Sequence, residues 1–473
     1  RDVLARGKRR APAVSPALRI AIENVEPTVD SGRFPVKCTA GEALRVQADI
    51  LMDGHDRLAA QVLWRAADEA GWHEERMAPL GNDRWAATFT PVRIGKYYFT
   101  IQAWRDTWGT HREQVEKKHA AGQDVSLDVE EGRQLVAAAH KRAQGRDAGL
   151  AATLGELVRH WDLQAMLAPS TANAMSAADP QDYKTTDPVH YPVMADRREA
   201  AYASWYELFP RSCGASPNEH GRFRDVIARL PAIRDMGFDV LYFPPIHPIG
   251  TSNRKGKNNA VRAQPGDPGS PYAIGSEHGG HTAVHPQLGS LQDFQALLKC
   301  ARDHDLEIAL DFAIQCSPDH PWLAQHPEWF AWRADGSLHY AENPPKRYED
   351  IVNPDFYSRR NGASHQARLW RELRNIVVFW IEQGVRMFRV DNPHTKPLPF
   401  WEWMIADIKS DYPDTVFLSE AFTRPKMMYR LAKLGFSQSY TYFTWRNDKQ
   451  ELTAYLSELS SPPVSDFFRP NFF

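Results

Sequence analysis

The chain has 473 residues, of which 42% are hydrophobic and 25% are charged, and its formal net charge is −2 at pH 7. This length predicts about three domains with sizeable cores, and the balanced charge excludes a general preference for nucleic acid or anionic membranes. No apolar run approaches the roughly 20 residues that span a bilayer. No signal-peptide pattern is present, and the four cysteines form no CxxC pair, so we expect a cytoplasmic protein with reduced thiols.

The first part of the chain predicts a tail, a β-rich domain and a helical segment. Residues 1–16 form a basic tail, typical of a solvated arm. Residues 17–128 contain runs of β-formers separated by turn signals such as Asp53-Gly54, which indicates an immunoglobulin-like β-sandwich. Residues 129–178 are rich in Ala and Leu at helical intervals and predict two or more helices. Residues 179–199 are polar and interrupted by Pro, so 129–199 is interpreted as a helical segment and connector.

From residue 200 to residue 473 strand and helix patterns alternate, which predicts a parallel sheet wrapped by helices. The expected strands are Tyr202–Phe209, Val240–Pro244, Glu307–Ala313, Arg386–Asp391, Val416–Ala421, Ser439–Trp445 and the beginning of a seventh at Phe468–Phe473. The expected helices are Phe223–Met236, Leu291–Asp303, Gln366–Gln383, Pro397–Ser410 and Lys426–Leu434. This is most of an α/β (β/α)8 barrel, incomplete at its C-terminal part.

Two long loops leave the C-terminal ends of the second and third expected strands. They are Ile246–Ser290 and Ile314–His365, and the second is expected to form a loop subdomain over about 314–365. Barrels build their active sites at this face, and long loops in compact domains are usually functional. We therefore expect both loops to line a site.

The stretch 384–393 (GVRMFRVDNP) is an apolar strand that ends in Asp391, with Arg389 two residues earlier. The period of two places both side chains on one face of the strand. A guanidinium beside Asp391 would keep its carboxylate ionised and oriented, as attack on an anomeric carbon requires. Taken alone, a structural Arg–Asp ion pair explains the pattern equally well.

The next strand also ends in a carboxylate, Glu420, and the preceding one carries Asp311. Adjacent strands lie roughly 4.8 Å apart, so Asp391 and Glu420 can reach the separation of about 5–5.5 Å that retaining glycosidases use. Glu420 would then be the proton donor and later the base. A third carboxylate at equivalent depth strengthens the interpretation of the set as catalytic.

These segments resemble the α-amylase-type enzymes of glycoside hydrolase family 13. That family's nucleophile strand has the pattern G-x-R-x-D, its acid strand ends in Glu, and its third strand has D-x-x-x-N-H. Here Gln315-Cys316 stands where Asn-His is usual, which puts an ordinary amylase in doubt.

The departure points to one subgroup, because several stretches resemble the maltosyltransferases that extend α-1,4-glucans with maltose 1-phosphate. These stretches are 244–250 (PPIHPIG), 254–259 (RKGKNN), 269–275 (GSPYAIG), 311–321 (DFAIQCSPDHP), 342–351 (ENPPKRYEDI) and 390–397 (VDNPHTKP). The resemblance implies that maltose 1-phosphate is contacted by Lys255, Gln315, Asp350 and Asn392, with Asn343 and Tyr348 near its phosphate or sugar. It also implies a bacterial homodimer.

The histidines at positions 278, 281 and 285 have HxxHxxxH spacing, but no nearby cysteine or positioned carboxylate completes a four-ligand zinc site. No Gly-rich phosphate loop follows a strand and opens a helix. We expect no metal and no organic cofactor.

Three functions remain open from the sequence. The first is a retaining hexosyltransferase that moves maltosyl units from maltose 1-phosphate to α-1,4-glucans and releases phosphate. The second is an α-1,4-glucan hydrolase, and the third is a non-catalytic glucan-binding protein. The resemblance further implies a transition-state Asp, an eighth strand and a C-terminal β-domain beyond Phe473. We expect the gene product to be longer and this piece to be inactive or poorly folded alone.

Overall fold

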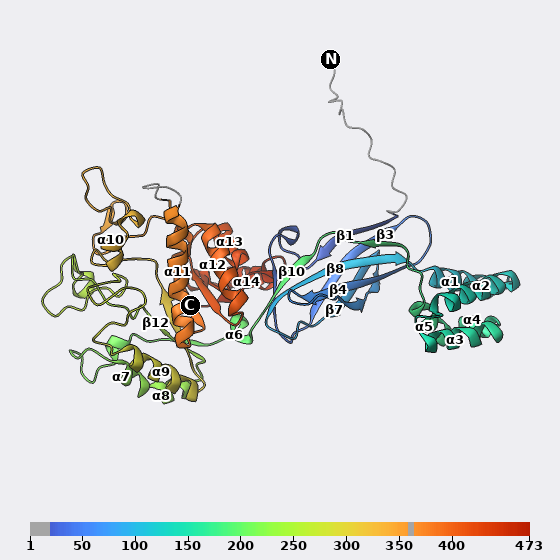
Figure 1. The fold of residues 1–473 in the computed structure, drawn as a ribbon, viewed down its shortest axis with the longest axis horizontal. Helices are drawn as coiled ribbons and strands as arrows, with labels where there is room; N and C mark the ends of the chain where they lie inside the picture. The colour runs from blue at the N-terminus through green and yellow to red at the C-terminus, as the bar shows by residue number, and fades with distance from the viewer. Residues whose placement is uncertain (1–18, 358–363) are drawn as a thin grey trace, which may run out of the picture. The chain divides into compact units, whose positions relative to one another are not determined.

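The computed structural model describes residues 19–357 and 364–473 (Figure 1), so the predicted basic tail lies outside the described residues. Within the described residues the chain forms two compact units. Unit 1 contains residues 19–28, 43–90 and 97–192, and unit 2 contains residues 29–42, 91–96 and 193–473. In the part of the chain that the structure describes, no helix is long and apolar enough to cross a membrane.

Unit 1 begins with antiparallel sheets whose apolar faces pack on one another. The first sheet has the order β1 (Ile20–Glu26), β3 (Leu44–Met52), β7 (Arg84–Phe89) and β6 (Ala78–Gly81). In the second, β4 (Leu58–Ala66) pairs with β5 (His73–Arg76) and β8 (Gly95–Arg105), and β8 pairs with β9 (Asp182–Thr186). Phe89 of the first sheet packs on Trp64 and Phe99 of the second, with ring centroids 5.0 and 6.0 Å apart.

Helices follow the strands earlier than the sequence pattern predicts. They are α1 (Thr107–Ala120), α2 (Ser126–Ala143), α3 (Ala148–Arg159), α4 (Leu163–Leu167) and α5 (Pro169–Ala177). The β-rich range was expected to reach residue 128, but its strands end at Arg105 and Asp106 caps α1 by accepting a hydrogen bond from the Gly109 amide at 2.7 Å. The expected connector 179–199 instead contains two strands, β9 and β10 (Tyr191–Asp196).

Unit 2 contains, among the described residues, a seven-stranded parallel sheet. Its order is β11 (Trp205–Glu207), β12 (Val240–Phe243), β13 (Glu307–Phe312), β16 (Met387–Asp391), β17 (Val416–Glu420), β18 (Gln438–Tyr440) and β19 (Pro470–Asn471). Each expected strand has a counterpart in it. The central strands are buried along their whole length, which is why they are continuous apolar runs. The parallel αβ architecture is therefore confirmed for these residues.

Helices connect the strands of this sheet (Figure 1). They are α6 (Arg198–Ala201), α7 (Phe223–Ile227), α8 (Leu230–Asp235), α9 (Leu291–Asp303), α11 (Ser364–Gln383), α12 (Leu398–Asp411), α13 (Pro425–Leu434) and α14 (Lys449–Ser460). The single helix expected over 223–236 is wrong, because α7 ends at Ile227 and a new helix begins at Leu230, with Pro231 in its first turn where its missing N–H is tolerated. The loop after β13 holds α10 (Pro321–Gln325) and the hairpin β14 (Ala341–Asn343) and β15 (Lys346–Tyr348).

A short early segment of the chain is built into unit 2. Its strand β2 (Val36–Thr39) pairs with β10 in parallel, so that Val193 lies opposite Val36. The Lys37 ammonium donates at 3.0 Å to the carbonyl of Ala432, which is a residue of α13. Residues 29–42 are thus held by elements that follow far along the sequence.

The end of β10 carries a buried carboxylate with two cationic partners. Asp196 is 1% exposed, and its oxygens accept from Lys409 Nζ at 2.6 Å and from Arg469 Nη1 at 2.7 Å. Lys409 lies on α12, and Arg469 directly precedes β19. One carboxylate therefore links β10, a helix of the parallel sheet and its last strand.

Candidate functional site

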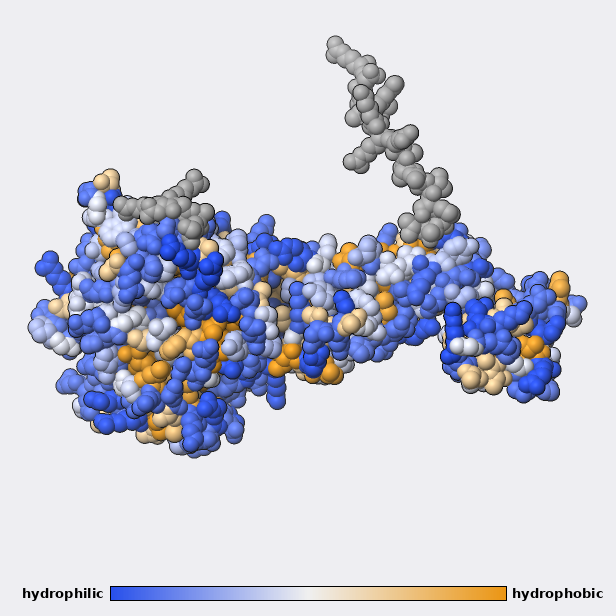
Figure 2. All heavy atoms as spheres, viewed as in Figure 1, coloured by the Kyte–Doolittle hydropathy of each residue, from blue (hydrophilic) through white to orange (hydrophobic). Residues whose placement is uncertain are grey.

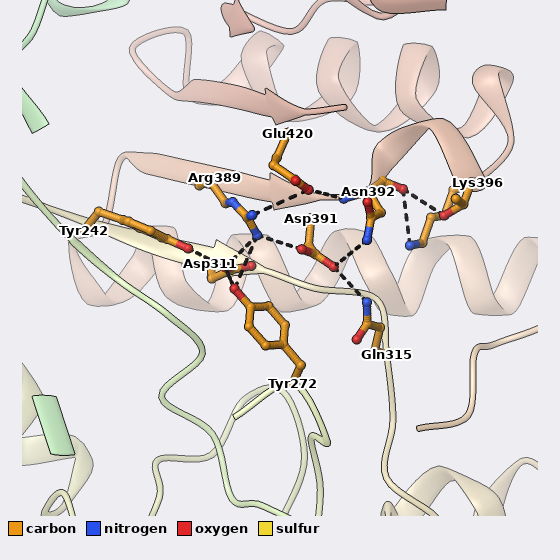
Figure 3. Close-up of polar contacts among 10 residues, drawn as sticks. Tyr242, Tyr272, Asp311, Gln315, Arg389, Asp391, Asn392, Lys396 and Glu420 are labelled. Carbon is orange, nitrogen blue, oxygen red and sulfur yellow. Dashed lines mark hydrogen bonds and ion pairs between the residues drawn. The ribbon is translucent and has the colours of Figure 1, made fainter. Parts of the chain in front are cut away.

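The carboxyl ends of β16 and β17 bring two carboxylates to one guanidinium. The parallel register of these strands pairs Asp391 with Glu420. Arg389 Nη1 donates to Asp391 Oδ1 at 2.8 Å, and its Nη2 lies 3.5 Å from Glu420 Oε2 (Figure 3). The three side chains that the sequence predicts as catalytic therefore lie together at the face where parallel barrels build active sites.

Asp311, from the neighbouring strand β13, completes this cluster. Its Oδ2 accepts hydrogen bonds from Arg389 at 2.9 Å, from the Tyr242 hydroxyl at 2.6 Å and from the Tyr272 hydroxyl at 2.9 Å. Burial raises the pKa of Asp311 to about 7, although the charge of Arg389 opposes this. Asp311 thus fixes the guanidinium from the side away from Glu420, and the two tyrosines fix Asp311.

Sequence reasoning missed both tyrosines. Tyr242 lies on β12, where the register of neighbouring strands pairs it with Ala309, two residues before Asp311. The period of two along parallel strands could have indicated that Tyr242 and Asp311 share a layer. Tyr272 comes from the long loop after β12, and no local pattern marks its direction.

Glu420 lies in an environment that favours its protonated form more than water does. Burial raises its pKa above the ordinary range, and the charge of Arg389 together with the Asn392 amide partly opposes the shift. The Asn392 backbone N–H donates to Glu420 Oε2 at 3.2 Å. A carboxyl with a raised pKa beside a carboxylate held by arginine is the pairing that separates an acid from a nucleophile.

Two amides orient the second oxygen of Asp391. Gln315 Nε2 donates to Asp391 Oδ2 at 2.7 Å, and Asn392 Nδ2 lies 3.3 Å from the same oxygen. Asn392 has a φ of 42°, in the left-handed region that asparagine tolerates better than most residues. This conformation lets one residue serve both carboxylates, through its side chain and its backbone amide.

A cation that sequence reasoning did not assign follows these residues. Lys396 Nζ lies 3.4 Å from the Asn392 carbonyl oxygen. Burial lowers the pKa of Lys396 to about 8, although the charges of Asp391 and Glu420 oppose the shift. Its ammonium thus lies within the electric field of both carboxylates (Figure 3).

The loop residues expected to bind a phosphosugar fall into two places. Asp350 is 3% exposed, burial raises its pKa, and the charge of Lys255 partly opposes this, so these two predicted residues lie in one neighbourhood. Asn253 Nδ2 donates to the Glu349 carbonyl at 3.0 Å and joins their loops. Among the described residues no hydrogen-bond partner reaches Asp350 Oδ1. A buried carboxylate oxygen in that state is available to a ligand hydroxyl.

Asn343 and Tyr348 lie on the hairpin β14–β15, where the register pairs Asn343 with Lys346 and Tyr348 with Ala341. Asn343 is exposed and Tyr348 is half-buried. Among the residues that the structure describes, neither side chain forms a hydrogen bond or an ion pair with the Asp391 cluster. Their roles at a phosphate stay predictions.

The histidines of the expected loop do not form the HxxHxxxH group. His281 instead lies with Cys316 and His320, and their ligand atoms are within 4.8 Å of one another. His281 uses one ring nitrogen on the Ala313 carbonyl, at 2.8 Å, and the other on His320 Nε2, at 3.1 Å. His320 Nδ1 accepts from the Trp322 amide at 3.1 Å. His281 and His320 can form these hydrogen bonds when both imidazoles are neutral, and burial lowers the pKa of both, which favours that state. The hydrogen bonds occupy both ring nitrogens of His281 and both of His320.

A helix-wrapped parallel sheet with an Asp–Arg–Glu cluster at the carboxyl ends of neighbouring strands is typical of retaining carbohydrate-active enzymes. The family model described as "Alpha-1,4-glucan:maltose-1-phosphate maltosyltransferase, domain N/S" matches residues 18–197. Relatives that carry the same enzyme name cover 96% of this chain, and one from Cereibacter sphaeroides is 52% identical over 459 residues. The chain belongs to the α-1,4-glucan:maltose-1-phosphate maltosyltransferase family.

The curated relatives differ in how much of their length this chain spans. A relative from Burkholderia pseudomallei (strain K96243) is 61% identical over 462 residues, and the chain spans 40% of its length. A relative from Pseudomonas aeruginosa is 53% identical over 460 residues, and the chain spans 68% of it. The share is 76% for the Cereibacter sphaeroides relative.

Solved structures of amylases resemble part of the chain. An α-amylase from Lactobacillus plantarum is 26% identical, with a TM-score of 0.44 over 56% of this chain and 60% of the amylase. A maltogenic α-amylase from Thermotoga neapolitana is 23% identical, with a TM-score of 0.43 over 55% of this chain and 57% of the amylase.

Proposed function

We propose that the protein transfers maltosyl units from maltose 1-phosphate to the non-reducing end of α-1,4-glucans and releases inorganic phosphate. Family membership supports the donor and acceptor, since the relatives' names contain both. The observation that carries the chemistry is the single guanidinium of Arg389 between Asp391 and Glu420. We further propose that unit 2 belongs to a (β/α)8 barrel, that unit 1 has an immunoglobulin-like sandwich, and that the enzyme is a cytoplasmic homodimer.

In the first step Asp391 attacks the anomeric carbon of maltose 1-phosphate. Its carboxylate is held by Arg389 at one oxygen and by Gln315 at the other, so its direction is set before the substrate binds. Glu420 gives its proton to the departing phosphate oxygen. The anomeric carbon inverts, and a β-maltosyl ester of Asp391 forms.

In the second step Glu420, now ionised, removes the proton from the 4-hydroxyl of the glucan acceptor. The hydroxyl oxygen attacks the anomeric carbon, the bond to Asp391 breaks, and a second inversion restores the α-linkage. In both steps the nucleophile is Asp391 and the proton donor and acceptor is Glu420. The proton that Glu420 gives to phosphate is replaced by the one it takes from the acceptor.

Donor binding draws on the loops after β12 and β13. Asp350, with its unpaired buried oxygen, would accept from a sugar hydroxyl, and Lys255 beside it would contribute charge and a donor. Asn343 and Tyr348 would approach the phosphate from the hairpin, and Asn392 would contact the sugar next to Asp391. Among the described residues of the free protein, Lys255, Asp350 and the hairpin form no hydrogen bond or ion pair with the Asp391 cluster, so one bound maltose 1-phosphate would have to span both places.

The main rival is hydrolysis of α-1,4-glucans with water in place of the acceptor. The hydrogen bond from Gln315 to Asp391 favours transfer, because this residue stands where ordinary amylases have asparagine and contacts the nucleophile directly. A non-catalytic glucan-binding role is opposed by the intact cluster of Asp391, Arg389 and Glu420.

Phosphate release by the full-length protein tests the proposal. We expect release from maltose 1-phosphate to require a short maltooligosaccharide and to lengthen that acceptor by two glucose units. Starch cleavage without phosphate-dependent turnover would make the protein a hydrolase. Glucan binding with no turnover of either substrate would support the binding-protein alternative.

The pH dependence of phosphate release should identify Glu420 as the acid. Protonated Glu420 is the active form in the first step, so kcat/KM should fall as pH rises through its raised pKa. Glu420→Gln cannot lose a proton there, and we expect it to lower kcat about 10²–10⁴-fold and to flatten this limb of the profile. If kcat/KM of Glu420→Gln still fell with rising pH as it does in the wild type, that fall would belong to another group.

A further inference from the structure

A half-exposed tryptophan without an assigned role is separated from Arg389 by two aromatic rings. Trp445 ends the short 3-10 helix Tyr442–Trp445 that follows β18, and 52% of its surface is exposed. Its ring is 4.9 Å from that of Phe422, which follows Glu420 by two residues. Phe422 in turn lies 5.7 Å from Tyr440, and the Arg389 guanidinium is 5.9 Å from the Tyr440 ring. A row of aromatic contacts through Tyr440 and Phe422 thus joins the cluster to Trp445.

The backbone that carries Trp445 is firmly anchored although the indole ring is open to solvent. The Tyr442 amide donates to the Tyr455 hydroxyl at 3.0 Å, and the Tyr442 hydroxyl donates to the Thr423 carbonyl. Thr441 Oγ1 accepts from the Phe443 amide at 3.3 Å. An indole ring on an anchored backbone, packed against Phe422 and Tyr442, loses less conformational entropy than a free one when a ligand covers it.

Two other aromatic side chains near Trp445 keep part of their surface open. Phe443 is 38% exposed, and Phe422 is half-buried. Figure 2 shows hydrophobic residues on this face of the molecule, around the place where Figure 1 draws the label C. A pyranose ring presents apolar C–H groups beside its hydroxyls, and such a ring covers an aromatic face well.

We propose that Trp445 is an acceptor-binding residue, on whose indole face a glucose ring of the α-1,4-glucan acceptor stacks. This inference rests on the proposed transfer reaction. The donor is expected at the loops after β12 and β13, which lie on one side of β16 in the strand order. Trp445 follows β18, on the other side of β16 and next to the strand of Glu420. An acceptor there would bring its hydroxyl to Glu420 without displacing the donor.

Separate Michaelis constants for donor and acceptor test the proposal in the full-length protein. We expect Trp445→Leu to raise the KM for maltohexaose about ten-fold, which corresponds to the loss of one aromatic stacking contact and its buried area. The KM for maltose 1-phosphate should stay within about two-fold of the wild-type value. Trp445→Phe keeps an aromatic face and should recover most of the acceptor affinity.

Trp403→Leu is the matched control, because Trp403 is a half-buried tryptophan on α12 that packs against Trp370 and Phe400. It should leave the acceptor KM unchanged. An unchanged acceptor KM in Trp445→Leu would overturn the proposal. So would a joint change of donor KM, acceptor KM and melting temperature, which would indicate that Trp445 packs against protein. Failure of the wild-type protein to release phosphate would instead contradict the transfer reaction.

Discussion

Asp391→Asn is expected to lower kcat for maltosyl transfer by at least about 10³-fold, because an amide cannot form the covalent ester. The substitution keeps the size of the side chain, and its one carbonyl oxygen can still accept from either Arg389 or Gln315. The variant should therefore fold and bind maltose 1-phosphate as the wild type does. Phosphate release measured in the first turnover, together with donor affinity from calorimetry, separates lost chemistry from lost binding.

Chemical rescue sharpens the assignment between the two carboxylates. In Asp391→Gly, azide can occupy the vacated space and attack the α-configured donor once, so the product should be β-maltosyl azide. In Glu420→Gly, azide would attack the covalent intermediate and give α-maltosyl azide. The opposite pair of products would exchange the roles of Asp391 and Glu420. Wild-type turnover by Asp391→Asn would exclude covalent catalysis at this residue.

Asp196→Ala is expected to destabilise unit 2 by about 3–5 kcal/mol, because it leaves the buried ammonium of Lys409 and the largely buried guanidinium of Arg469 without their counter-ion. Lys409 and Arg469 each donate to a different oxygen of Asp196. Lys409 lies on α12 and Arg469 directly precedes β19, so the three residues are far apart in sequence. Urea unfolding of the variant and the wild type measures the difference. Asp414→Ala is the control, since Asp414 forms a 3.2 Å ion pair with Arg386 at the surface and should contribute less than about 1 kcal/mol.

The difference in the free energy of unfolding between the wild type and Asp196→Ala should change with pH in one direction. Burial alone would raise the pKa of Asp196, but Lys409 and Arg469 more than offset it, so the folded pKa is below the ordinary value. The ion cluster then contributes its full stability above the ordinary carboxyl pKa and loses it as pH falls through the lowered pKa. The gap between variant and wild type should narrow in acid. A gap that stays constant down to strongly acidic pH would indicate a packing effect instead.

The strands of the parallel sheet could be predicted because each is a short apolar run that alternates with an amphipathic helix. The helix α1 could not, since only Trp108, Thr110 and Val115 of its fourteen residues are buried and the periodic signal is correspondingly weak. The strand β10 lies in a polar stretch interrupted by proline, and its partner β2 is far away in sequence. Local patterns contain no information about such a partner.

The site was predictable where function lies at strand ends and unpredictable where it depends on loops. Asp391, Arg389 and Glu420 follow from period two and the direction of parallel strands. The hydroxyl of Tyr272 reaches Asp311 across 39 residues of chain, and no spacing rule indicates that contact. The same limit applies to Trp445, which was expected to lie within a strand but ends a 3-10 helix.

The early segment within unit 2 has a consequence for the order in which a ribosome can complete this protein. The strand β2 leaves the exit tunnel long before β10, its parallel partner, has been synthesised. Until then its unpaired edge is available to other chains, and edges of this kind promote aggregation. A nascent chain released before residue 193 would contain β2 without its partner strand, and we expect chaperones that bind unpaired extended segments to hold it.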